Sequence, residues 1–252
     1  MDDDEIRHTG IWPFSLFPSH WGALKPPSGQ TAQVTAVFDP VALAWTAGPK
    51  LMQAGWVGLE IMPRSFLWKV VDAEQANVGN LAEAWATAHQ SAIADLFAER
   101  LVTYTVDQAA KNAMEQSIDA YRRGHFLATV RTLMPEVERF GRMVASPDGT
   151  LPKNQKEAIA AIKGYLGNVP VSHFDPIESL CVYSLIADDL FATVFTAAEA
   201  AQLGAGPNRH AELHGLASYG DLRGATKMLC IVDFLLCSVT AAMRSHGQST
   251  VA

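Results

Sequence analysis

A long apolar segment near the carboxyl end limits the choice of fold. Residues 221–243 are predicted to form a helix, and the run Met228–Val232 within it carries no charged side chain. A helix that is apolar on every side has to be covered on every side, so we expect it at the centre of a bundle. Residues 228–243 are too short to span a membrane, which takes ~20 apolar residues, and they contain Asp233.

The rest of the chain shows helical periodicity and no convincing alternation typical of strands. Apolar residues recur at intervals of three and four, as at Val78, Leu81 and Trp85. Gly124 is expected just past the end of one helix, and Pro135 is expected to break or kink another. The predicted helices cover residues 41–54, 65–101, 106–123, 125–145, 155–166, 176–200 and 221–243, with a short helix starting at Arg209.

The pattern predicts an all-α fold in two parts. Residues 1–104 begin with an irregular arm rich in proline, glycine and aromatic residues and continue with additional helices, to which we assign no role. Residues 105–252 are predicted to hold an up-and-down helical bundle, over about 105–246. An apolar content of 49% in 252 residues suffices for a buried core.

Location and redox state follow from the first residues and from the cysteines. The start Met-Asp-Asp-Asp-Glu lacks the positive charge of a secretory signal, so we expect a cytoplasmic protein. Three cysteines lie in apolar surroundings without CxxC spacing, and buried reduced thiols are expected. They are Cys181, Cys230 and Cys237.

The charge distribution bears on nucleic-acid binding in two opposite ways. A net charge of −7 argues against a nucleic-acid partner. Five arginines nevertheless gather within about six helical turns, where they could meet phosphates or form a solvated helix face. They are Arg122, Arg123, Arg131, Arg139 and Arg142.

Residues 204–227 hold the side chains best suited to chemistry. A Gly-Pro-Asn break places Arg209, His210 and His214 in the opening turns of a helix, with Asn208 as its predicted N-cap. Arg209 offers a planar fork for phosphate oxygens, and His214 can transfer a proton near neutral pH. On an ideal helix these two residues lie about 140° apart. They could therefore meet only through a frayed first turn or in a site completed by another chain.

Two other interpretations of these residues stay open. Both histidines could be ordinary packing residues, with Arg209 paired to an acid. His210 and His214 also share one helix face, as zinc ligands do. The two common zinc motifs fail, however, because Ala211 and Leu213 stand where each requires a glutamate, and a third ligand is not obvious. We predict neither a metal nor a cofactor.

The run 209–214, Arg-His-Ala-Glu-Leu-His, resembles the R-x(4–6)-H motif of the HEPN domain family. His210 stands where the family usually has a polar residue, most often asparagine. The setting is similar too, with His-Gly at the end of the motif, Tyr219-Gly220 after it, and Lys227 opening an apolar helix. Upstream, residues 121–126 and 134–138 resemble the first core helices of the same bundle. The resemblance covers about residues 105–246.

This resemblance implies a metal-independent endoribonuclease of defence or toxin type, acting as a homodimer whose two motifs line one cleft. The 2′-hydroxyl of RNA would attack its own phosphorus and leave a 2′,3′-cyclic phosphate. It implies that His214 is the acid/base, that Arg209 binds the phosphate and that His210 orients them. The residues that would support or contact the substrate are Asn208, Tyr219, Glu138, Arg142 and Lys227.

Several features of that implied function have alternatives. Glu138 could support the cleft or could simply pair with Arg142 four residues later. The expected partners are RNA, a second copy of the chain and an antitoxin or other regulator, with no membrane. A catalytically inactive HEPN-like binding or dimerisation module is the main alternative. A histidine-based metal- or ligand-binding helical protein is a further one.

Overall fold

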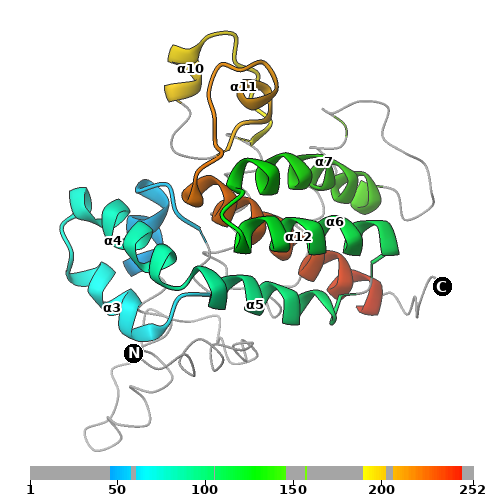
Figure 1. Ribbon diagram of the computed structural model, residues 1–252, viewed down its shortest axis with the longest axis horizontal. Helices are drawn as coiled ribbons and strands as arrows, with labels where there is room; N and C mark the ends of the chain where they lie inside the picture. Colours follow the sequence, from blue (N-terminus) through cyan, green and yellow to red (C-terminus); the bar gives the residue numbers. More distant parts are fainter. Residues whose placement is uncertain are drawn as a thin grey trace, which may run out of the picture.

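The computed structural model, shown in Figure 1, describes residues 46–57, 61–104, 106–145, 157, 190–202 and 207–245. All regular structure within these ranges is helical, which confirms the predicted all-α class. The predicted arm and most of the helix predicted over 155–166 lie outside the described residues. The helices are residues 46–53, α3 (Arg64–Asp72), α4 (Gln75–Ala88), α5 (Gln90–Leu101), α6 (Gln108–Arg122), α7 (Phe126–Ala145), α10 (Ala197–Gln202), α11 (Arg209–Leu213) and α12 (Leu222–Ser245).

Helix α12 lies at the centre, as its apolar sequence predicts. It packs against α4, α5, α6 and α7, and Figure 1 shows it running across the middle of the helical body. Every residue from 224 to 236 is buried, so this part of the helix is covered on all sides. The thiol of Cys230 is buried and reduced, as expected. Described residues on both sides of position 104 belong to the same hydrophobic cluster around this helix.

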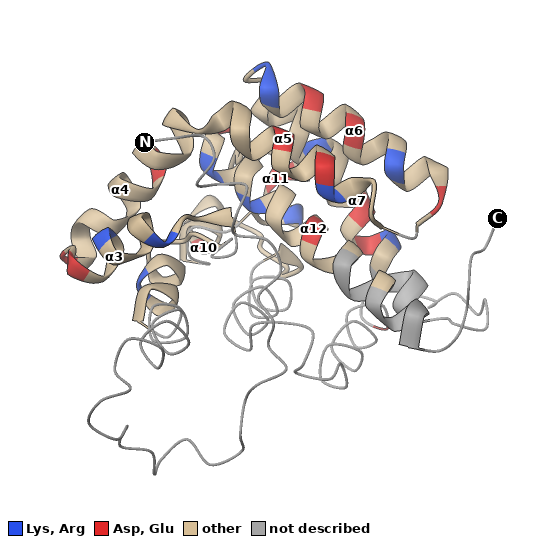
Figure 2. Cartoon of the chain, turned by 90° about the horizontal axis from the view of Figure 1, so that it is seen from below, with Lys and Arg blue, Asp and Glu red and all other residues tan. Residues whose placement is uncertain are grey.

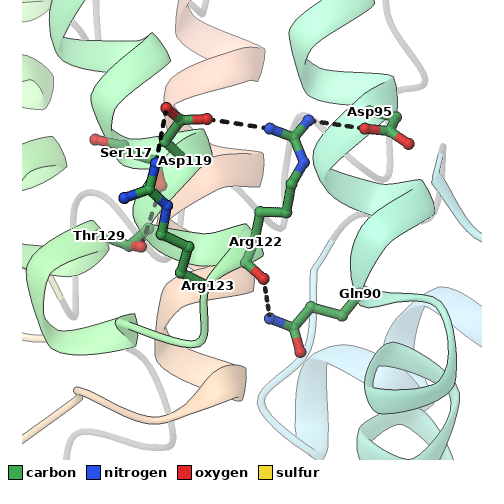
Figure 3. Close-up of polar contacts among 7 residues, drawn as sticks. All are labelled: Gln90, Asp95, Ser117, Asp119, Arg122, Arg123 and Thr129. Atoms are coloured by element: carbon green, nitrogen blue, oxygen red, sulfur yellow. Dashed lines mark hydrogen bonds and ion pairs between the residues drawn. The ribbon is translucent and has the colours of Figure 1, made fainter.

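Helices α5, α6 and α7 pack as consecutive neighbours. Gly124 takes a φ of +76° between α6 and α7, which confirms its expected place just past a helix end. Figure 3 shows Arg122 of α6 between Asp95 of α5, at 2.7 Å, and Asp119 of its own helix, at 3.1 Å. Arg122, one of the five clustered arginines, therefore links α6 to α5.

The single helix predicted over 65–101 is wrong, because three helices occupy this range. The chain is extended at Ala73, where Lys50 Nζ donates a 2.8 Å hydrogen bond to the carbonyl oxygen. His89 ends α4, and its Nδ1 lies 2.8 Å from the carbonyl oxygen of Trp85. Neither break follows a glycine or proline, so the local sequence carries no ordinary signal for it.

Helix α7 continues through Pro135, so of the two predicted outcomes the break does not occur and the kink stays a prediction. A proline in a helix interior costs about 3 kcal/mol. The apolar face of α7 packs against α6 and α12, and four side chains of that face are fully buried. Each buried side chain of this size contributes roughly 1.5–3 kcal/mol, which together exceeds the cost of the proline. They are Val130, Leu133, Val137 and Phe140.

The helix predicted over 176–200 is also wrong at its carboxyl end. Residues 192–196 are not helical, and α10 starts afresh at residue 197. The Oγ1 of Thr196 accepts from the Glu199 N–H at 3.1 Å, and Glu199 Oε2 accepts from the Phe195 N–H at 2.6 Å. This T-x-x-E capping arrangement is a helix-start signal that the sequence does contain. It overrides the continuous helix that periodicity favours.

Candidate functional site

Helix α11 is a short helix whose start is fixed by Asn208. Asn208 Oδ1 accepts a 2.7 Å hydrogen bond from the Ala211 N–H, which confirms the predicted N-cap. Its Nδ2 donates to the carbonyl oxygen of Ala192 at 2.9 Å. Asn208 is fully buried, so it anchors the start of α11 and offers no surface to a substrate.

A cleft of about 720 Å³ lies between α7 and α11 and extends to the start of α6. Arg209 Nη2 lies 3.3 Å from Glu138 Oε2 on the cleft wall, so the fold brings together two predicted site residues from distant parts of the chain. The cleft is lined by Asp107, Arg131, Met134, Pro135, Glu136, Glu138, Arg139, Arg209, Glu212 and Leu213.

The other cleft arginines are also paired with carboxylates. Arg131 Nε lies 3.1 Å from Glu212 Oε1, and Arg139 pairs with Asp107 and, at 3.3 Å, with Glu136. Figure 2 shows Lys and Arg interspersed with Asp and Glu along α5, α6 and α7. The cleft therefore has mixed charge, and an anion that enters it has to compete with the carboxylates.

Two carboxyl groups of the cleft have shifted pKa values of opposite sign. Burial raises the pKa of Glu136, against the opposing effect of Arg139. For Asp107, burial acts in the same direction but is outweighed by the hydrogen bond from the Ala110 N–H and the pairing with Arg139, so its pKa is lowered. Asp107 therefore holds its negative charge more firmly than Glu136 does.

The two histidines of the motif lie together and away from the cleft. The ring centroids of His210 and His214 are 4.3 Å apart, and His210 makes an edge contact with Phe195 at 6.0 Å. His214 is exposed at the carboxyl end of α11, and neither ring lines the cleft that Arg209 faces. Arg209 and His214 therefore stay on different sides of α11 within one chain, as expected for an ideal helix.

The remaining predicted site residues serve other places in the fold. Tyr219 is half-buried, and its N–H donates to Glu212 Oε2 at 3.0 Å. Lys227 is fully buried within α12, so it does not line the cleft. Arg142 belongs to α7, but its side chain lies outside those described.

Glu212 is a residue whose importance the sequence does not reveal. Its side chain is only 2% exposed and joins α11 to Arg131 of α7 and to the loop at Tyr219. A glutamate inside a short polar helix ordinarily faces solvent, and nothing in the local pattern points to its distant partner. The same holds for Asp107, whose pairing with Arg139 depends on the packing of α6 against α7.

Among the described residues, no group of three or more His, Cys, Asp or Glu side chains is arranged to hold a metal ion. Within the same ranges, no helix combines the length and hydropathy that a membrane crossing requires. Protein-family models, curated proteins and solved structures were each compared with the chain, and none of them matches it.

Proposed function

We propose that this protein cleaves RNA without a metal ion, with Arg209 binding the scissile phosphate and His214 transferring protons. The proposal rests on the resemblance of residues 209–214 to the HEPN motif and on the all-α fold. The expected product is a 2′,3′-cyclic phosphate. A cytoplasmic enzyme of this kind would act in defence or as a toxin, under the control of an antitoxin or other regulator.

The observation that best supports the proposal is the placement of both groups on one anchored turn. Asn208 ties the start of α11 to the body of the protein through its two hydrogen bonds. Arg209 is then held at the cleft, and His214, five residues further along the chain, is exposed to solvent. An arginine and an exposed imidazole are the two groups that a general acid–base cleavage of a phosphodiester requires.

The separation of these two groups within one chain favours a composite site. Arg209 faces α7, whereas His214 lies against His210 on another side of α11. A second copy related by a two-fold axis near α11 would place the His214 of one protomer beside the Arg209 of the other. The proposed enzyme is therefore a homodimer, with one RNA strand crossing the axis.

The chemistry proceeds by proton transfer at two oxygens. As the 2′-oxygen forms its bond to phosphorus, His214 of one protomer accepts the 2′-hydroxyl proton. As the bond from phosphorus to the 5′-oxygen breaks, the His214 of the other protomer, already protonated, donates a proton to the leaving oxygen. Arg209 stabilises the charge that develops on the phosphorane oxygens, and it does so only after the phosphate displaces Glu138.

Single-stranded RNA cleavage in excess EDTA tests the proposal. His214→Ala should lower the rate by at least ~10²-fold with little change in RNA binding, whereas Arg209→Ala should weaken both. Arg209→Lys should restore only part of the activity because the planar fork is lost. His210→Asn, which introduces the residue most usual in the family, should be tolerated.

The cleaved ends should carry 2′,3′-cyclic phosphate, and a 2′-deoxy group at the scissile position should block cleavage. An equal rate on the deoxy substrate, or activity that requires zinc, would disprove the mechanism.

A catalytically inactive binding or dimerisation module is the second candidate. It is favoured by the ion pairing of the cleft, where Arg131, Arg139 and Arg209 all contact carboxylates. Such a cleft suits a partner that carries both charges better than it suits a polyanion. A dimer that shows no RNA cleavage in wild-type form would support this candidate.

A further inference from the structure

His210 and His214 form a close pair of imidazoles outside the cleft. Their ring centroids are 4.3 Å apart with planes inclined at 40°, and the His214 N–H donates to the His210 carbonyl oxygen at 3.1 Å. That backbone bond keeps the two residues at helical i,i+4 spacing, although His214 is the last residue of the turn. Two histidines at this spacing on one helix face are a recurrent pair of zinc ligands.

A second observation points to a ligand at the same place. His210 Nδ1 is buried, and no group of the described residues hydrogen-bonds to it. Buried imidazole nitrogens are ordinarily paired, so this one calls for an explanation. The neighbouring His214 is exposed, and its ring can turn in solvent without disturbing the core.

We propose that His210 and His214 bind one divalent transition-metal ion, each through one ring nitrogen. Imidazole nitrogen suits Zn²⁺, Cu²⁺ and Ni²⁺, whereas Mg²⁺ and Ca²⁺ prefer oxygen ligands. Glu212 lies between the two histidines in sequence, but its carboxylate is engaged by Arg131 and Tyr219 inside the protein. Water therefore completes the coordination from the exposed His214 side.

Occupation of this site has a consequence for RNA cleavage, and this part of the inference rests on the proposed function. A metal ion bound to His214 takes the lone pair with which the imidazole would accept a proton. The ion therefore inhibits an enzyme that needs no metal.

Calorimetric titration of the metal-stripped full chain with ZnCl₂, and separately with NiCl₂, tests the binding step without RNA. The wild-type protein should bind one more ion than His214→Gln does, or bind it at least ~10-fold more tightly, a loss that even outer-shell changes to metal sites produce. His210→Asn should show the same loss. His125→Gln is the matched control, since His125 is exposed in the loop between α6 and α7 and should leave binding unchanged.

The outcomes separate the metal site from the proposed cleavage. Loss of the ion in both motif variants but not in the control supports the site, whether or not the protein cleaves RNA. Absence of saturable binding in the wild type, or equal binding by His214→Gln, overturns it. His214 is exposed, so His214→Gln should keep the wild-type circular dichroism spectrum and remain a fair test even where His210→Asn perturbs the fold.

Discussion

A carboxylate buried between α5 and α12 allows a test of how charge is accommodated in this core. Asp233 is fully buried in the middle of the apolar helix. Its Oδ2 lies 2.8 Å from Arg100 Nη2, and its Oδ1 accepts a 2.6 Å hydrogen bond from the hydroxyl of Tyr104. Burial and the neighbouring Asp233 raise the pKa of Tyr104, so the hydroxyl stays protonated and donates.

Arg100→Met should lower the free energy of unfolding by about 3 kcal/mol. Removing one partner of a buried ion pair costs roughly 3–5 kcal/mol, because the remaining charge is left uncompensated. The lower end applies because the Arg100 side chain is 25% exposed and is partly hydrated already. Adding Asp233→Asn to this variant removes the uncompensated charge and keeps an oxygen for Tyr104. The double variant should therefore be more stable than Arg100→Met alone, by about 1 kcal/mol or more.

Urea unfolding followed by tryptophan fluorescence measures these differences. A double variant less stable than Arg100→Met would refute the uncompensated-charge explanation.

Three further predictions concern local geometry, and urea unfolding measures each of them. Gly224→Ala should destabilise by ~1–3 kcal/mol, because the new Cβ would lie 2.1 Å from a backbone oxygen, whereas Gly79→Ala, with nearest atoms at 3.9 Å, should stabilise by ~0.5–1 kcal/mol. Lys50→Met should cost ~1.5–3 kcal/mol by removing three charged hydrogen bonds to the end of α3, while the exposed Lys69→Met should change stability by less than about 0.5 kcal/mol. Asp107→Asn keeps the helix cap but removes the charge, so its deficit should be present above the unfolded pKa of Asp107 and vanish as pH falls through the lowered folded pKa. Equal effects in a variant and its control, or a pH-independent deficit for Asp107→Asn, would contradict these explanations.

Features that depend on neighbouring residues follow from local sequence patterns. Helical periodicity gives the all-α class, and the unbroken apolar run predicts the central position of α12, which the structure confirms. Asn208 caps α11 and Gly124 follows α6 as predicted, because capping involves residues within one turn. Near Thr196, where the continuous helix is wrong, the T-x-x-E pattern is a local signal for the start of a new helix.

Features that join distant parts of the chain depend on tertiary packing. The break after α3 depends on Lys50, and the continuity of α7 through Pro135 depends on the helices packed along it. The pairing of Arg209 with Glu138 likewise arises from the approach of α11 to α7. These contacts follow from how the summed burial of all the helix faces sets their relative positions. Local sequence patterns do not predict these positions, because contacts between helices form only when the chain folds.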